Sequence, residues 1–338
     1  MRAGNRRQAG CPARAHRGRG HLPRGDRVPR QRRQRCRVFA RGRRSRGSGR
    51  CVARDHAACA LGPFEGRRER LRPRVLRRRV GSSARVTDLF SLEDRVAVVT
   101  GGAGQLGSEI VRGLEERGAH VAVFDIAADR FRVDVTDRSA IARATEEVAQ
   151  EWGVPHVLVN AAALDSPPDA PAEEVGPFES YPERSFDQVM DVNVKGTFLS
   201  SQVVGARMAA EGRGSIVNVS SIYGMLSPVQ SLYEFRRGGG EEFFKPVAYS
   251  VSKSALYNLT RYLATYWAKS GVRVNTLTLA GVWNDQPEEF IEAYAMRMPI
   301  GRMADAREVV GPIVFLASDA SSYVTGANLV VDGGWSAW

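Results

Sequence analysis

Cysteine is absent from this chain after Cys59, and a long apolar run is absent throughout. The four cysteines (Cys11, Cys36, Cys51 and Cys59) lack the spacing of metal ligands, so we expect neither a zinc site nor a disulfide framework in the rest of the chain. No stretch of about 18 apolar residues and no apolar core of a signal peptide occurs. These absences predict a cytoplasmic protein that binds no metal and does not enter a membrane.

Lysine is absent from residues 1–85, which contain 28 Arg and four acidic residues, a net charge of +24. Of the chain's 49 basic and 37 acidic residues, 21 and 33 remain for residues 86–338, a net charge of −12. A basic arm for nucleic acid and a transit peptide are alternatives for this leader. Natural basic arms mix Lys with Arg, however, whereas Arg, Gly, Ala and Pro without Lys are typical of a GC-rich stretch read in a non-native frame. We therefore expect residues 1–85 to be disordered, or to precede a true start near Val86, and nucleic acid is not an expected partner.

Residues 86–338 alternate short apolar runs with amphipathic helical patterns and contain no internal repeat. Such strands, buried on both faces, predict one domain with a doubly wound parallel α/β sheet of the Rossmann type and helices on both faces. Ligands of this architecture bind beyond the carboxyl ends of the strands. The candidate strands are Val96–Val99, His120–Phe124, Phe131–Val135, His156–Asn160, Ser215–Val219, Val272–Leu277 and Asn328–Val331.

A glycine cluster follows the first strand, and Gly102, Gly104 and Gly107 fit G-x-G-x-x-G. Glycines permit a tight turn and let the backbone approach a pyrophosphate, which binds the free amides of the next helix. Asp125 ends the second strand 18 residues after the last glycine, where an acid can accept hydrogen bonds from a ribose diol. The combination of strand, glycines, helix, strand and acid predicts a dinucleotide site.

Tyr249 and Lys253 have the i, i+4 spacing that stacks two side chains on one face of a helix. A free phenol has a pKa of about 10, and a nearby cation stabilises phenolate. The pair alone also fits a solvated helix face, but beside a dinucleotide site it predicts a proton-transfer catalyst.

From about Leu92 to its C-terminus the chain resembles the short-chain dehydrogenase/reductase family. The motifs that carry the resemblance occur in the family's order: Thr100–Gly107, Asp134–Val135, Val159–Ala163, Asn193–Gly196, Ser220–Ser221, Tyr249–Lys253, Tyr323–Gly326 and Val331–Gly334. The resemblance implies a catalytic set of Asn193, Ser221, Tyr249 and Lys253. It also implies a cofactor site at Gly101, Gly102, Gly104, Gln105, Leu106, Gly107, Asp125, Asp134, Val135, Asn160, Ala161, Ala162, Tyr249, Lys253 and Val282.

The family also implies a role for each catalytic residue. Tyr249 transfers the proton of the alcohol, and Lys253 lowers its pKa and binds the nicotinamide ribose. Ser221 polarises the substrate oxygen, with Ser220 as its rival, and Asn193 bends a helix and anchors a water that relays protons.

The chain departs from the family's pattern at several positions, including Leu279–Ala280 in place of the family's Pro-Gly after the strand at Val272–Leu277. Gln105 stands where a glycine is usual, and Ala161 and Ala163 replace the second Asn and the Gly of the family's N-N-A-G motif. Ser221 and Tyr249 are 28 positions apart, where about a dozen is usual, which indicates an insertion at about 225–246. This insertion must leave and re-enter near the active site, so it is either a surface loop or a segment that contacts substrate or another subunit.

Asp125 favours NAD over NADP, because its carboxylate repels a 2′-phosphate and the glycine loop holds no basic residue. For the substrate we expect a secondary alcohol or ketone, such as a sugar, sugar acid or polyol, with contacts from Ser221, Trp283, Arg236 and Arg237. A 3-oxoacyl thioester reductase, acting on an acyl carrier protein, is the alternative. A homo-oligomer, dimer or tetramer, is expected through the helices predicted at Glu183–Ala210 and Ala248–Ala268.

Overall fold

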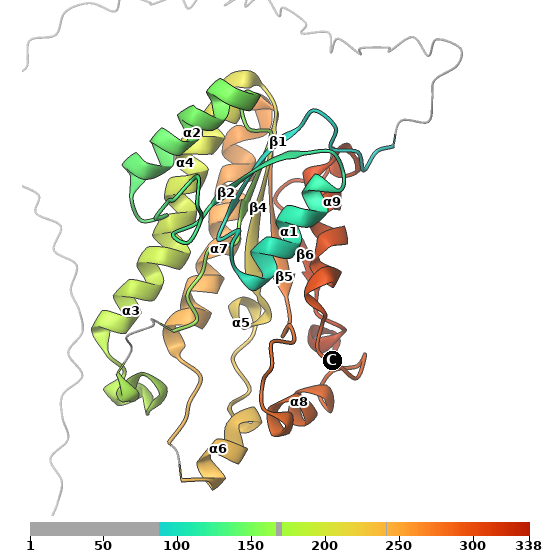
Figure 1. The fold of residues 1–338 in the computed structure, drawn as a ribbon. Coiled ribbons are helices and arrows are strands. Elements are labelled where there is room, and N and C mark those ends of the chain that lie inside the picture. The colour runs from blue at the N-terminus through green and yellow to red at the C-terminus, as the bar shows by residue number, and fades with distance from the viewer. Residues whose placement is uncertain (1–87, 167–170, 241) are drawn as a thin grey trace, which may run out of the picture. The chain divides into compact units, whose positions relative to one another are not determined.

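The computed structural model describes residues 88–166, 171–240 and 242–338, and these contain one sheet of six parallel strands. The expectations for residues 1–85 lie outside the described residues. The strands occur in the order β2-β1-β3-β4-β5-β6 across the sheet (Figure 1). Their bounds are β1 Val96–Thr100, β2 His120–Phe124, β3 Val157–Asn160, β4 Gly214–Ser221, β5 Val272–Leu279 and β6 Asn328–Val331. The predicted doubly wound α/β fold is confirmed.

Helices cover both faces of this sheet. On one face, α1 (Gln105–Glu115) and α9 (Val310–Ala317) pack on the strands, and on the other α2 (Arg138–Trp152), α4 (Thr197–Glu211) and α7 (Val247–Trp267) do so. The shorter helices are α3 Glu183–Met190, α5 Ile222–Met225, α6 Glu234–Gly238 and α8 Glu288–Ala295. Short 3-10 turns occupy Ala172–Val175, Phe178–Ser180, Gln230–Tyr233, Ala268–Ser270, Ala306–Val309, Asp319–Ser321 and Trp335–Ala337.

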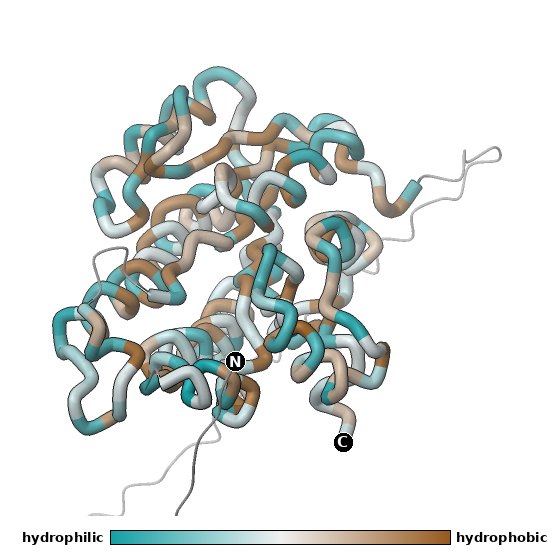
Figure 2. The backbone as a smooth tube through the Cα atoms, turned by 60° about the horizontal axis from the view of Figure 1, so that its bottom comes forward, coloured by the Kyte–Doolittle hydropathy of each residue, from teal (hydrophilic) through white to brown (hydrophobic). Residues whose placement is uncertain are grey.

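Each face of the sheet has its own apolar core. Ile110 and Leu114 of α1 pack with Val99, while Val204 and Met208 of α4 pack with the opposite side of the sheet. Hydrophobic residues recur at intervals along the outer helices, as the hydropathy colouring in Figure 2 shows. This spacing gives each helix one apolar face, which packs on the sheet. Because helices cover both faces of the sheet, the strands carry apolar side chains on both faces.

The segment Phe131–Val135 is not a strand, and the sequence prediction there is wrong. It forms one isolated bridge, in which Asp125 pairs with Arg132. Phe131, Val133 and Val135 are buried, which reproduces the alternation of a strand. Since β2 ends at Phe124, however, only Asp125 remains beside the segment to accept a ladder partner.

The helical region predicted as Glu183–Ala210 is interrupted in its middle. Between α3 and α4, residues Asp191–Gly196 form a π-helical turn, which begins two residues before Asn193. A π turn adds one residue to the helical circuit and shifts the side chains that follow. The change of register therefore coincides with one of the predicted catalytic residues.

His156 joins the amino ends of two strands. The imidazole Nδ1 of His156 accepts a hydrogen bond from the backbone N–H of Val96 at 2.9 Å. The backbone N–H of His156 donates to the carbonyl of Val96 at 2.7 Å. Partial burial lowers the pKa of His156 to about 4, and the guanidinium groups of Arg213 and Arg95 add to this effect. The imidazole is therefore neutral in the folded protein at neutral pH.

Stability should fall as the pH drops from about 6.5 towards 4. In this window the unfolded chain, with an ordinary histidine, binds a proton that the folded chain does not, so acid favours unfolding. We expect a loss of roughly 1 to 2 kcal/mol from His156, since solvent screens a half-buried group. Thermal unfolding at pH 7 and pH 5 tests this, because His156→Asn should reduce the difference. If wild type and His156→Asn lost the same stability between pH 7 and pH 5, another group would cause the acid sensitivity.

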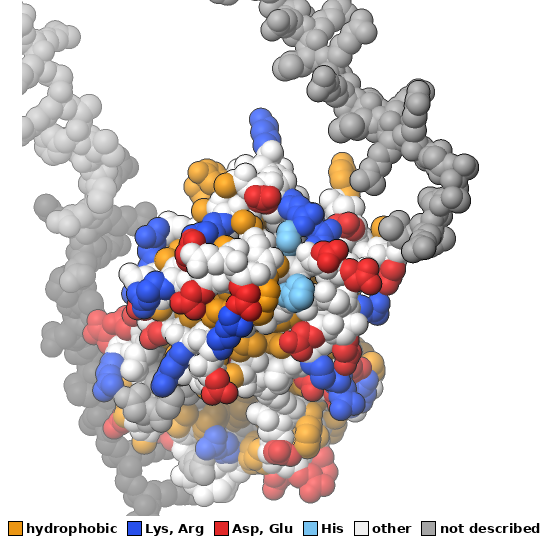
Figure 3. All heavy atoms as spheres, turned by 45° about the horizontal axis from the view of Figure 1, so that its top comes forward, with side chains coloured by type: hydrophobic (Ala, Val, Ile, Leu, Met, Phe, Trp, Pro, Cys, Tyr) orange, Lys and Arg blue, Asp and Glu red, His pale blue; other side chains and the backbone are white. Residues whose placement is uncertain are grey.

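No helix in the described part of the chain is long and apolar enough to cross a membrane. Basic and acidic side chains are interspersed over the face shown in Figure 3. Pairs such as Arg95 with Asp319, 3.1 Å apart, contribute to this mixed surface.

Candidate active site

The glycine loop between β1 and α1 is held tightly against the end of β3. Gly101 has a φ of +68°, and a Cβ there would lie 2.6 Å from the Cα of Ala162. Thr100 fixes the same junction, since its hydroxyl accepts hydrogen bonds from the amides of Ala161 at 3.2 Å and Ala162 at 3.3 Å. Only glycine fits this conformation and this approach of two backbones.

The N-terminus of α1 has the chemistry of an anion site. Gly104 is its N-cap and supplies no side chain, so no side chain caps the first amides of the helix. Free amides and the helix dipole favour a phosphate at this position. The donors present therefore fit the pyrophosphate of a dinucleotide.

Asp125 is oriented by the backbone around it. Its two carboxylate oxygens accept hydrogen bonds from the amides of Ala103, at 3.1 Å, and Ala127, at 2.9 Å. Each oxygen retains a second lone pair. The carboxylate can therefore still accept hydrogen bonds from a ribose diol.

A cavity of about 840 Å³ lies at the carboxyl ends of the strands. It is lined by most of the residues predicted from the sequence: Gly101, Gly104, Gln105, Leu106, Gly107, Asp125, Asp134, Val135, Ala161, Ala162, Ser221, Tyr249, Lys253 and Val282. Gln105 also donates a hydrogen bond to the carbonyl of Trp283 at 2.7 Å, which joins the glycine loop to the segment after β5. The glutamine that departs from the family's pattern thus links two walls of the cavity.

Two predicted cofactor residues do not line this cavity. Asn160 is buried, and its amide donates to Asn218 at 2.8 Å and to Ser201 at 3.1 Å. Gly102 faces Val123, since a Cβ there would lie 2.9 Å from that side chain. Both residues pack against neighbouring elements at the strand ends and are not part of the cavity surface.

Lys253 is buried and Tyr249 is partly buried in the first turns of α7, with the Lys253 ammonium 5.6 Å from the centroid of the Tyr249 ring. Lys253 donates to the carbonyl of Val219 at 3.0 Å. Ser221 ends β4 and bonds to Tyr249, whereas the hydroxyl of Ser220 donates to the carbonyl of Lys253 at 2.9 Å. The hydroxyl of Ser220 is thus engaged by the backbone, and Ser221 is the serine directed at Tyr249.

Burial governs the pKa values of this pair. It raises the pKa of Tyr249 above its ordinary value, the carboxylate of Asp165 raises it further, and the hydrogen bond from Ser221 lowers it in part. Burial lowers the pKa of Lys253 to about 8, against an opposing effect of Asp165. The phenol is therefore protonated at neutral pH, whereas from the sequence we expected Lys253 to bring its pKa down.

Asn193 clamps two segments instead of facing the cavity. Its side-chain amide donates to the carbonyl of Leu164 at 2.8 Å and to the hydroxyl of Ser252 at 2.9 Å, and its oxygen accepts from the amide of Leu164 at 2.7 Å. Ser252 precedes Lys253 in α7. The π turn at Asn193 thus connects the chain after β3 to the helix that carries Tyr249 and Lys253.

Three of the four predicted substrate contacts do not line the cavity. The guanidinium of Arg236 stacks over Phe243, 3.9 Å from the ring centroid. Arg237 donates to the carbonyls of Phe243 at 2.7 Å and Gln230 at 2.9 Å. Trp283 is about half exposed and meets Gln105 through its carbonyl. Both arginines therefore stabilise the 225–246 segment, and Ser221 remains at the cavity.

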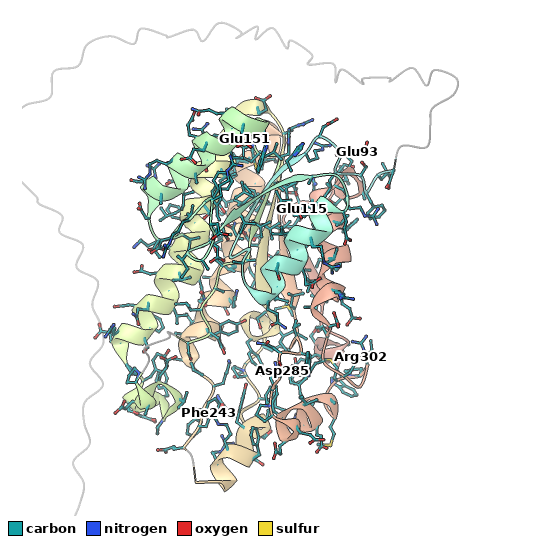
Figure 4. The ribbon with its side chains drawn as sticks, viewed as in Figure 1. Glu93, Glu115, Glu151, Phe243, Asp285 and Arg302 are labelled. Atoms are coloured by element: carbon teal, nitrogen blue, oxygen red, sulfur yellow. The ribbon has the colours of Figure 1, made fainter. Side chains whose placement is uncertain are left out.

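Five aromatic rings form a continuous row that reaches the cavity. Successive ring centroids are 4.8, 5.4, 5.6 and 4.7 Å apart along Phe243, Tyr233, Phe290, Tyr294 and Trp335. Figure 4 places Phe243 beside α6, below the carboxyl edge of the sheet. Tyr233, Phe290 and Tyr294 line the cavity directly. The sequence analysis missed these rings, because they come together only when the 225–246 segment, α8 and the last residues meet.

Asp165 and Lys245 are further cavity residues that the sequence analysis did not single out. They form an ion pair, and both line the cavity that holds Tyr249. The Lys245 ammonium lies 5.3 Å from the centroid of the Tyr249 ring. Its position four residues before Tyr249, at the end of a segment that re-enters the site, is the signal that could have identified it.

A second cavity, of about 740 Å³, adjoins the first and shares Tyr223 and Lys245 with it. It is lined by residues 176–179, 224–228 and 244–247 among others, and by none of the predicted catalytic residues. Because the larger cavity contains the predicted catalytic residues, it is the candidate active site.

A family model described as enoyl-(acyl carrier protein) reductase, a short-chain dehydrogenase/reductase model, matches residues 101–336. The chain belongs to the short-chain dehydrogenase/reductase family. It is an oxidoreductase of that type, whose hydride donor or acceptor is a nicotinamide cofactor.

Relatives of this dehydrogenase/reductase match nearly their whole length. Cis-4-hydroxycyclohexanecarboxylate dehydrogenase of Sinomonas cyclohexanicum is 35% identical, over 72% of this chain and 97% of its own. D-threitol dehydrogenase of Mycolicibacterium smegmatis is 33% identical, over 73% and 95%. A short-chain dehydrogenase from Leptospira borgpetersenii, solved with NAD+, is 31% identical with a TM-score of 0.65, over 75% and 98%.

The relatives differ in cofactor. NAD is bound in the Leptospira structure, whereas a gluconate 5-dehydrogenase from Burkholderia cenocepacia, 27% identical, was solved with NADP and tartrate, at a TM-score of 0.64 over 74% of this chain and 98% of its own. Both structures thus contain a nicotinamide cofactor. The choice between NAD and NADP must depend on residues of the individual chain.

Proposed function

We propose that the protein is an NAD-dependent dehydrogenase of a secondary alcohol in a sugar, polyol or sugar acid. The observation that carries this proposal is that Tyr249, Lys253 and Ser221 line the same cavity as the glycine loop. Relatives at 33% and 27% identity are named for D-threitol and gluconate, which supports this substrate class.

In alcohol oxidation, Ser221 holds the substrate oxygen beside the Tyr249 hydroxyl. The O–H proton passes to a Tyr249 that has first lost its own, while the C–H hydrogen leaves as hydride. A bound nicotinamide supplies the acceptor for that hydride. Lys253 stabilises the phenolate by its charge, and Asn193 fixes α7 relative to the chain after β3. Carbonyl reduction reverses these steps, and the protonated phenol is then the acid.

Asp125→Ala should lower the preference for NAD over NADP at least tenfold, because it removes both an acceptor for the ribose diol and a charge that repels a 2′-phosphate. The measurement is kcat/KM for each cofactor with one substrate. Asp125→Asn is the closer variant in shape, since it removes the charge and keeps one acceptor oxygen, while an NH2 donor replaces the other oxygen. An unchanged ratio in both variants would show that Asp125 does not read the ribose.

The substrate class is tested with purified protein by following NADH absorbance over a panel of polyols, sugars and sugar acids. We expect turnover with NAD that is lost in Tyr249→Phe. An acetoacetyl thioester with NADPH tests the alternative reductase function. Faster turnover of this thioester than of any alcohol in the panel would replace our proposal.

We also propose a homo-oligomer that forms through α4 and α7. Tyr262 and Tyr266 are stacked on the outside of α7, with exposed fractions of 63% and 66%, and Phe198 of α4 is 44% exposed. A row of exposed rings on a helix is typical of a surface that another subunit covers. Sedimentation at micromolar concentration should show an oligomer that Tyr262→Glu and Tyr266→Glu together dissociate, while Tyr323→Glu does not. A wild-type monomer would contradict the proposal.

A further inference from the structure

The active-site cavity holds an ion pair that the mechanism does not use. Lys245 is nearly buried, with 13% of its side chain exposed, whereas its partner Asp165 is 56% exposed. The two ammonium groups of Lys245 and Lys253 lie 5.3 and 5.6 Å from the centroid of the Tyr249 ring. A substrate bound at Tyr249 therefore lies within reach of Lys245 and, through the ion pair, of Asp165.

The 225–246 segment is arranged to hold Lys245 in this position. The backbone amide of Lys245 donates to the side chain of Gln230 at 3.0 Å, and Arg237 donates to the carbonyl of Gln230 at 2.9 Å. Arg236 packs on Phe243, whose ring packs on Tyr233. These contacts hold the start of the segment, at Gln230, against its end, at Lys245. Lys245 is the cationic residue of the segment that lines the cavity.

The charges of the cavity discriminate between possible substrates. Its charged lining residues are Asp125, Asp134, Asp165, Lys245 and Lys253. Asp125 and Asp134 belong to the predicted cofactor site, so Asp165 and Lys245 are the charges left for a substrate. A substrate carboxylate brought to Lys245 would meet the negative charge of Asp165. A hydroxyl can instead accept from the ammonium and donate to the carboxylate, and the ion pair stays intact.

We propose that Lys245 and Asp165 together bind a hydroxyl group of an uncharged polyhydroxy alcohol and select against the corresponding carboxylate. This inference rests on the proposed function and narrows it from sugars, polyols and sugar acids to neutral substrates. The aromatic wall at Tyr233, Phe290 and Tyr294 is consistent with such a compound, since rings pack well against the C–H groups of a polyol.

The experiment compares pairs of probes that differ only at one end, such as galactitol with galactonate and threitol with threonate. For wild-type protein, kcat/KM should be at least about tenfold higher for the neutral member. Asp165→Asn should shift this ratio about tenfold towards the carboxylate, because Lys245 is then released as an unpaired cation. Asp319→Asn, which breaks the surface ion pair with Arg95, is the matched control and should leave the ratio unchanged.

Lys245→Gln provides an independent test if Asp165→Asn does not fold. It should raise KM for the neutral polyol about fivefold and change kcat less than about twofold, since Lys245 binds substrate but transfers no proton. A wild-type preference for the carboxylate, or no change in substrate ratio and KM in either variant, would overturn the inference alone. If neither member of any pair is oxidised with NAD, the proposed function fails as well.

Discussion

Tyr249→Phe is expected to lower kcat by about 10³-fold, which lies within the range that general acid–base catalysis contributes. The ring remains to fill its place beside Lys253, and only the hydroxyl with its transferable proton is lost. NAD should therefore bind as in wild type, and titration of cofactor fluorescence measures this separately from turnover.

Because the pKa of the Tyr249 phenol is raised, alcohol oxidation by wild-type protein should accelerate with pH above neutrality.

Tyr323→Phe is the control for this variant, because Tyr323 is fully exposed and does not line the cavity. It should keep wild-type kcat. If Tyr249→Phe retained kcat within about tenfold, another group would have to move the proton, and the pH profile of that variant would show which.

Gly107→Val is expected to weaken NAD binding about 100-fold. A Cβ at Gly107 would lie 2.7 Å from the Cα of Gly102 and would overlap the carbonyl oxygen of Gly101, so the loop must open. Overpacking of this kind costs about 1 to 3 kcal/mol or more, and each 1.4 kcal/mol is a factor of ten in affinity. Isothermal titration with NAD measures the change.

Gly311→Ala is the matched control on α9, since a Cβ there meets nothing within 4 Å. It should bind NAD like wild type and should be slightly more stable, because alanine favours a helix more than glycine does. Near-wild-type affinity in Gly107→Val would mean that the loop rearranges freely, contrary to the packing described above.

The parts of the site that follow from local rules were predictable from the sequence. The glycine loop, Asp125 and the pair of Tyr249 and Lys253 depend on spacing along a strand, a turn or a helix, and the structure brings all of them to one cavity. The choice between Ser220 and Ser221 does not follow from spacing alone. The hydrogen bond of Ser220 to the backbone of Lys253 distinguishes them, and no sequence pattern encodes that contact.

The sequence does not determine features that depend on tertiary contacts. Phe131–Val135 has the alternation of a strand but lacks a partner beyond Asp125. Arg236 and Arg237 have the charge expected of substrate contacts, yet local contacts with Phe243 and Gln230 engage them. Lys245, in the same segment, reaches the cavity instead. Composition could indicate that this segment carries a cation to the site, but the fold determines which one.

The five rings that run from Phe243 to Trp335 will govern how this enzyme can be redesigned. Each ring touches the next, so trimming Phe290 to enlarge the cavity also removes support from Tyr233 and Tyr294. The hydroxyl of Tyr294 in turn accepts a hydrogen bond from the amide of Gly281, in the wall that follows β5. Libraries for new substrates should therefore vary neighbouring rings in pairs, because single replacements disturb both ends of the row.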